Sequence, residues 1–66
     1  MFLKVNGEFV EIKDGANIGD LLEKLEMLEK RVAVELNGDV IPNSDLLDKT
    51  LQDQDIVEIV KAIGGG

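Results

Sequence analysis

The sequence opens with MFLKVNGEFVEI, residues 1–12, in which two short apolar runs flank the dipeptide Asn6-Gly7. Asn-Gly between such runs is the strongest short-range signal for a β-hairpin, because a two-residue turn needs positive φ at both of its positions. We therefore predict a hairpin with strands at about 2–5 and 8–12.

The alternation of side chains along these strands separates a core face from a solvent face. The polar Lys4 and Glu11 mark the solvent face, and Phe2 and Phe9 share their parity. The opposite parity belongs to four aliphatic residues that we expect in the core: Leu3, Val5, Val10 and Ile12. Two phenylalanines are therefore expected on the outside of the sheet.

A helix is predicted after the hairpin. Asn17 lies at the N-cap position, and Asp20, three residues later, gives a weak form of the capping box. In IGDLLEKLEMLEK, residues 18–30, apolar residues recur at spacings of three and four, which produces one buried stripe along a helix. The stripe comprises Ile18, Leu21, Leu22, Leu25 and Leu28. Met27 lies beside the stripe, where we expect it to pack against the flank of the core.

The second half of the chain repeats the hairpin signal. RVAVELNGDVIP, residues 31–42, predicts a strand, a tight turn at Asn37-Gly38, and a short strand ended by Pro42, which cannot donate to a ladder. The polar stretch at residues 43–55 is interpreted as a short helical turn or an irregular crossover. The last strand, within DIVEIVKAI, begins at about residue 56.

The resulting order, β-β-α-β-β-turn-β, predicts an α+β fold in which one helix packs across one face of a mixed sheet of four to five strands. The helical crossover allows the first and last strands to lie parallel at the centre of the sheet. This is the β-grasp, or ubiquitin-like, architecture. We place the domain at residues 1–63, followed by a flexible glycine tail at 64–66, because glycine has the most backbone freedom.

One face of the predicted sheet carries an apolar patch. Because Glu58 is polar, Ile56 and Val60 should lie on the open face, with Val57 and Ile59 in the core. The open face would also carry Phe2, Phe9, Ala33, Lys4, Glu11 and Glu35. An apolar patch ringed by charge is typical of a docking surface, although single exposed apolar residues are also normal. The candidate docking residues are Phe2, Phe9, Val60 and Ile63.

The composition limits the possible partners. The 66 residues form one small domain with 7 basic and 14 acidic side chains, a net charge of −7. Such a field repels nucleic acid and anionic membrane surfaces, so a protein with a basic patch is the better partner. The sequence contains no apolar run of about 20 residues for a membrane span and no secretory signal. We therefore expect a cytoplasmic protein that is monomeric when free.

Catalysis by this chain alone is not expected. The sequence lacks Cys and His, which removes thiolate nucleophiles, imidazole bases, disulfides and soft metal sites. The acidic pairs Asp45/Asp48 and Asp53/Asp55 lack the pattern of a calcium loop and are interpreted as solvated loops. No glycine-rich nucleotide motif occurs. We expect no metal and no cofactor bound by this chain.

Three segments of the chain together resemble a known family. They are V-x-x-N-G-x-V-x-P from Val34 to Pro42, D-x-D-x-V-E-I-V from Asp53 to Val60, and the terminal Gly65-Gly66. In this order and spacing they resemble the ThiS family, the small sulfur carrier proteins of thiamine biosynthesis. The N-terminal hairpin and helix fit this family too, so the resemblance covers essentially the whole chain.

The resemblance implies that Gly66 carries sulfur as a thiocarboxylate and that the protein is a co-substrate, with no enzyme activity of its own. In this family a ThiF-type adenylyltransferase uses ATP and Mg²⁺ to convert the terminal carboxylate into an acyl-adenylate. Sulfur from a cysteine desulfurase or another persulfide donor then replaces AMP, and thiazole synthase (ThiG-type) receives it. Gly64 and Gly65 would thread into the partner active sites, since they have no Cβ to clash.

Two positions depart from the family pattern, and two related functions stay open. Gln54 stands where members often have Gly, at a turn position that favours positive φ, and Asn43 replaces a basic residue. The small subunit of molybdopterin synthase shares the fold, the Gly-Gly end and the thiocarboxylate. A ubiquitin-like modifier instead joins its last glycine to lysines of target proteins. All three begin with the same adenylation, so the sequence separates them poorly.

Overall fold

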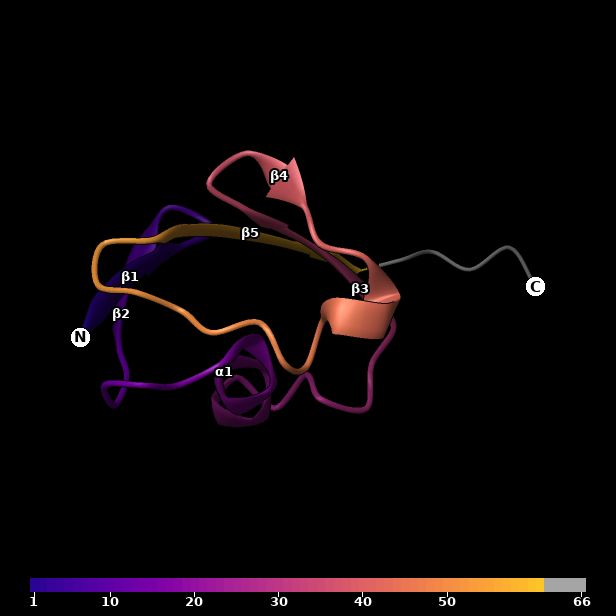
Figure 1. Ribbon diagram of the computed structural model, residues 1–66, viewed down its shortest axis with the longest axis horizontal. Coiled ribbons are helices and arrows are strands. Elements are labelled where there is room, and N and C mark those ends of the chain that lie inside the picture. Colours follow the sequence, from indigo (N-terminus) through magenta and orange to yellow (C-terminus); the bar gives the residue numbers. More distant parts are fainter. Residues whose placement is uncertain (62–66) are drawn as a thin grey trace.

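A computed structural model describes residues 1–61, which form a five-stranded mixed sheet with one helix packed against it (Figure 1). The elements are β1 (Phe2–Val5), β2 (Glu8–Glu11), α1 (Ile18–Lys24), β3 (Val32–Leu36), β4 (Asp39–Val40), the 3-10 helix η1 (Asn43–Asp45) and β5 (Ile56–Lys61). The strand order is β2-β1-β5-β3-β4, with β1 and β5 parallel and the other neighbours antiparallel. The predicted β-grasp fold is confirmed. Within residues 1–61, no helix has the length and apolar character that crossing a membrane requires.

Both hairpins turn on Asn-Gly, as predicted. Asn6 and Gly7 have φ of 49° and 85°, and Asn37 and Gly38 have φ of 52° and 90°. Positive φ at both turn positions matches the right-handed twist of the flanking strands, which favours tight pairing. The turns therefore fix the register in which Val5 pairs with Glu8 and Leu36 with Asp39.

The core lies between the inner face of the sheet and α1, and its residues are aliphatic. The buried set comprises Leu3, Val5, Ile12, Ala16, Ile18, Leu21, Leu22, Val32, Val34, Leu36, Leu51, Val57 and Ile59. The predicted parity is therefore confirmed for β1 and β5, whereas Val10 on the edge strand β2 is only half-buried. An edge strand has a neighbour on one side alone, so its inward side chains are covered less completely.

The predicted capping box at the start of α1 is present. The Asn17 side chain accepts a hydrogen bond from the Asp20 backbone N–H at 2.8 Å, and the Asp20 carboxylate accepts one from the Asn17 N–H at 3.0 Å. Each side chain thus satisfies a backbone donor that the first helical turn leaves without a partner.

The predicted length of the helix, residues 18–30, is wrong, because α1 ends at Lys24. Glu26 adopts a left-handed φ of 59°, its N–H donates to the Glu23 carbonyl, and the Met27 N–H donates to the Leu22 carbonyl at 2.7 Å. This is a Schellman ending, which satisfies carbonyls of the last turn. Six further residues would extend the helix by about 9 Å, whereas the chain reverses here to enter β3.

The early end of α1 also changes where the predicted stripe lies. Leu25 is half-buried and Leu28 is exposed, so only the first three residues of the stripe belong to the buried core. Met27 packs against the flank of the core, as predicted.

The segment that follows η1 crosses beside the start of α1 (Figure 1). The Ile18 N–H donates to the Lys49 carbonyl at 2.9 Å, and the Leu51 N–H donates to the Ala16 carbonyl at 2.9 Å. A Cβ on Gly19 would lie 3.1 Å from the Leu47 backbone oxygen. This close approach gives Gly19 a structural role that no sequence pattern indicated.

Candidate docking surface

The outer face of the sheet exposes large apolar side chains from four strands. Phe2 on β1 is 54% exposed, Phe9 on β2 is 79% exposed, Val40 on β4 is 69% exposed, and Ile56 and Val60 on β5 are 50% and 58% exposed. The registers of the ladders place them on one face with five further residues. We call this set the open sheet face: Phe2, Lys4, Phe9, Glu11, Ala33, Glu35, Val40, Ile56, Glu58 and Val60. The predicted exposure of Phe2, Phe9, Ile56 and Val60 is confirmed.

The central strand β5 is held on both sides beyond the end of β1. Backbone pairing between β1 and β5 ends at Val57. The Asn6 side chain provides the next hydrogen bonds to β5. Its Oδ1 accepts from the Ile59 N–H at 2.7 Å, and its Nδ2 donates to the Ile59 carbonyl at 3.1 Å. On the other side β3 pairs with β5 as far as Lys61. The strand that leads toward residues 62–66 is thus fixed up to the last described residue.

The second turn asparagine holds the other end of β5. The Asn37 Oδ1 accepts from the Ile56 N–H at 2.8 Å, and its Nδ2 donates to the Asp55 carboxylate at 3.0 Å. Both asparagines therefore act through their amide groups as well as through their turn geometry, and sequence analysis missed this second role. An Asn at the first position of a tight turn that ends a strand neighbouring the last strand is the signal that could have indicated it.

The two acidic residues before β5 have structural partners. Asp53 accepts from the Phe2 N–H at 2.7 Å, and Asp55 accepts from the Gln52 N–H at 2.7 Å. Gln54 between them has φ of 71°, the left-handed conformation expected at this turn. These carboxylates hold the loop against β1 and β3, and residues 1–61 contain no group of three or more His, Cys, Asp or Glu placed to hold a metal ion.

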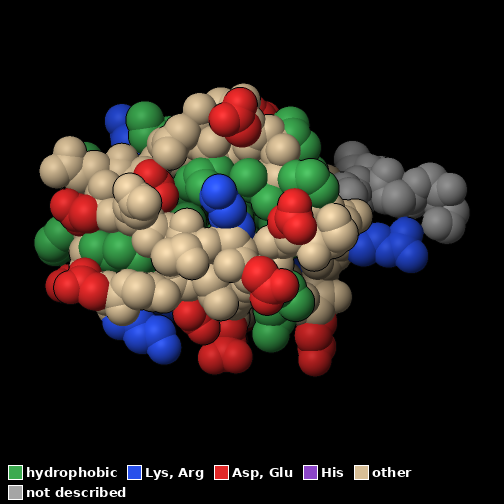
Figure 2. All heavy atoms as spheres, in the orientation of Figure 1, with side chains coloured by type: hydrophobic (Ala, Val, Ile, Leu, Met, Phe, Trp, Pro, Cys, Tyr) green, Lys and Arg blue, Asp and Glu red, His purple; other side chains and the backbone are tan. Residues whose placement is uncertain are grey.

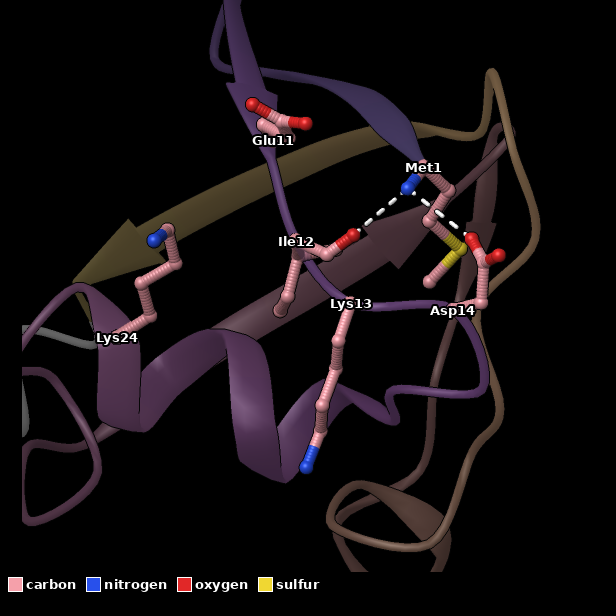
Figure 3. Close-up of a pocket in the computed structure, with 6 residues that line it drawn as sticks. All are labelled: Met1, Glu11, Ile12, Lys13, Asp14 and Lys24. Atoms are coloured by element: carbon pink, nitrogen blue, oxygen red, sulfur yellow. Dashed lines mark hydrogen bonds and ion pairs between the residues drawn. The ribbon is translucent and has the colours of Figure 1, made fainter.

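An open groove of about 460 Å³ lies beside the start of β1, on the helix side (Figure 3). The Met1 ammonium donates to the Ile12 carbonyl at 2.7 Å and to Asp14 Oδ1 at 3.1 Å. In Figure 3 the side chains of Lys13 and Lys24 extend in separate directions. Reaction sites bring polar groups to one point, and this groove does not have that arrangement.

Acidic side chains are spread over the side of the molecule drawn in Figure 2, with hydrophobic side chains exposed between them. The 14 acidic and 7 basic residues give the whole chain a net charge of −7. A field of this sign steers basic surfaces toward the molecule. The remaining predicted site residues, Ile63, Gly64, Gly65 and Gly66, lie outside the described residues.

Comparison with known proteins gives consistent results. The sequence model of the ThiS family matches residues 3–66. The chain is 38% identical over 65 residues to the sulfur carrier protein ThiS of Bacillus subtilis, covering 97% of this chain and 98% of that protein. It is 36% identical over 66 residues to a thiazole synthase of Paramagnetospirillum magneticum, covering all of this chain but 20% of that protein. The crystal structure of the thiamine biosynthesis protein ThiS from Geobacter metallireducens superposes with a TM-score of 0.83 at 35% identity, with both chains fully covered.

Proposed function

The chain belongs to the ThiS family, and from this premise we propose that it is a sulfur carrier protein of thiamine biosynthesis that carries sulfur on the carboxyl group of Gly66. The observation that carries the proposal is the family match, which extends from residue 3 to the terminal glycine. The β-grasp fold and its agreement with a ThiS crystal structure support it. The protein is a small carrier on which partner enzymes act.

The proposed chemistry begins with activation. An α-carboxylate, with an ordinary pKa of about 3.3–3.7, is ionised at neutral pH and is a poor electrophile. A partner adenylyltransferase, using ATP and Mg²⁺, transfers AMP to the Gly66 carboxylate and releases pyrophosphate. The terminal sulfur of a persulfide then attacks the carbonyl carbon and AMP leaves. A thiol cleaves the resulting S–S bond, which leaves a thiocarboxylate on Gly66.

The composition of the chain agrees with this division of roles. The sequence contains no cysteine, so no thiol of this protein can carry the sulfur. Gly64 and Gly65 lack a Cβ, which suits passage through a narrow partner site. The persulfide comes from a cysteine desulfurase or another donor, and the acceptor of the sulfur is thiazole synthase.

The relative from Paramagnetospirillum magneticum supports the choice of acceptor. A protein named thiazole synthase there contains a segment similar to the whole of this chain, within a polypeptide about five times as long. Domains joined in one polypeptide commonly act together. We therefore place thiazole synthase among the partners, with the adenylyltransferase docking on Phe2, Phe9, Val60 and Ile63.

Mass spectrometry of the intact chain from its native cells tests the proposal directly. The expected result is a species heavier by the replacement of one oxygen with sulfur, with fragments that place the change on Gly66. A Gly66 joined to a lysine of another protein would contradict it in favour of a modifier. A sulfur-loaded chain that restores molybdopterin synthesis but not thiazole synthesis would contradict the pathway.

Two variants separate the roles of the tail and of the surface. Deletion of Gly66 should leave the melting temperature nearly unchanged and abolish ATP–pyrophosphate exchange by the adenylyltransferase; retained exchange would contradict the tail chemistry. Val60→Asp should weaken binding of that enzyme without unfolding the domain, because Val60 is exposed. Leu28→Asp, in the loop after α1, is the matched control and should bind normally.

A further inference from the structure

The open sheet face carries an uneven charge pattern among its apolar residues. Lys4 is its one cationic side chain within residues 1–61. The registers place Lys4 between Phe9 on β2 and Ile56 on β5, which are both exposed. The cation therefore lies inside the apolar part of the face.

Lys4 has an aromatic neighbour but no acidic partner in the described chain. Its Nζ lies 6.0 Å from the centroid of the Phe9 ring, at the outer limit of a cation–π contact. The ion pair formed within residues 1–61 joins the Met1 ammonium to Asp14. A surface that covers Phe9 also removes water from Lys4, and a desolvated ammonium is costly unless an anionic group compensates it. A partner that docks here has to supply that group.

Two acidic residues of the same face oppose each other. Glu35 on β3 pairs directly with Glu58 on β5, and neither forms an ion pair with another described residue. Like charges at directly opposite positions of an antiparallel pair destabilise the sheet. Ala33 and Val60 form the next outward-facing pair of the ladder, toward the end of β5. A local arrangement that lowers stability is typical of a functional position, and one basic side chain across both carboxylates would relieve the repulsion.

We propose that the open sheet face binds a partner whose complementary surface is apolar, with an acidic side chain opposite Lys4 and a basic side chain, best a guanidinium, opposite Glu35 and Glu58. The proposal rests on the proposed function, since the partner is the enzyme that adenylates Gly66. A guanidinium fits because its planar fork can bind carboxylates with several donors at once.

Charge favours this partner over a second copy of the chain. Each copy carries a net charge of −7, so two copies repel each other as they approach. The face itself has three acidic side chains, Glu11, Glu35 and Glu58, for one cation. A basic rim on the partner compensates this excess of negative charge and also raises the rate of association.

The test uses the full chain with the adenylyltransferase of the same organism. Lys4→Met removes the charge and keeps the length of the side chain, and Lys49→Met outside the face is its control. Glu58→Gln removes one carboxylate, and Glu23→Gln on α1 is its control. For each variant, KM and kcat for the carrier in ATP–pyrophosphate exchange and the melting temperature are measured.

Lys4→Met is expected to raise KM by about tenfold or more, because it leaves a carboxylate of the partner buried and unpaired. The kcat should stay unchanged, since Lys4 contributes to binding of the carrier and takes no part in the chemistry of the carboxyl group. Glu58→Gln should raise KM and also raise the melting temperature. A higher KM means weaker binding, whereas a higher melting temperature means a more stable domain. Loss of a residue with a structural role alone would not weaken binding while it stabilises the fold.

A wild-type KM for Lys4→Met or for Glu58→Gln would overturn the proposal. If the wild-type chain supports no exchange at all, the proposed function fails and this inference fails with it. If the wild type exchanges and these two variants match their controls, the inference alone is wrong. A dimer of the free chain that Lys4→Met dissociates, seen by sedimentation, would assign the face to a second copy and also overturn the proposal.

Discussion

Asn6→Ala should destabilise the domain by about 2–3 kcal/mol, and the structure indicates how this loss divides. The two hydrogen bonds from Asn6 to the Ile59 backbone measure 2.7 and 3.1 Å. Each contributes about 0.5–1.5 kcal/mol, and because Asn6 is exposed we take about 1–2 kcal/mol for both. Its φ of 49° lies in the left-handed region, which costs Ala about 1 kcal/mol more than it costs Gly or Asn.

Asn6→Gly separates the two contributions, because glycine keeps the left-handed turn but lacks the amide. It should lose about 1–2 kcal/mol, the share of the hydrogen bonds. In a domain of this size, 1 kcal/mol corresponds to a shift of about 4–8 °C in the melting temperature. Asn6→Ala should therefore melt roughly 10–20 °C below the wild type.

Urea denaturation of the wild type, Asn6→Gly and Asn6→Ala, analysed by linear extrapolation, measures both steps. Glu8→Ala, an exposed neighbour of the turn, is the control and should lie within about 0.5 kcal/mol of the wild type. Equal stabilities of the Gly and Ala variants would refute the left-handed turn. A Gly variant as stable as the wild type would refute the contribution of the amide link to β5.

Four further substitutions test the helix and the loop before β5. Leu21→Ala, at a fully buried position, should cost about 2–5 kcal/mol in urea denaturation, whereas Leu28→Ala should cost under about 0.5 kcal/mol; equal losses would mean that the helix runs on to Leu28. Asn17→Ala should lower the free energy of unfolding by about 1 kcal/mol, because it removes the capping box. An unchanged free energy of unfolding would contradict a stabilising role for the hydrogen bonds between Asn17 and Asp20. Gln54→Gly should raise the melting temperature, gaining about 0.5–1 kcal/mol by relieving a φ of 71°, and a lower melting temperature would contradict the strain.

The elements that the sequence predicts correctly are those whose signals are local. Asn-Gly imposes its turn through the φ angles that these two residues tolerate, so both hairpins and their registers follow from the chain alone. The parity of polar residues then assigns each strand a buried and an exposed face, which places Phe2, Phe9 and Val60 outside. The candidate docking surface was predictable for this reason.

The tertiary structure decided where α1 ends and how β5 is held. The apolar spacing continues through Leu25 and Leu28, but periodicity records only which face a residue would take in a helix. It carries no information about the reversal that the chain makes at Glu26 to enter β3. The link from Asn6 to Ile59 spans 53 residues of sequence, and it forms because the parallel pairing of β1 with β5 brings them together. The opposition of Glu35 and Glu58 likewise depends on the register between β3 and β5, which long-range packing sets.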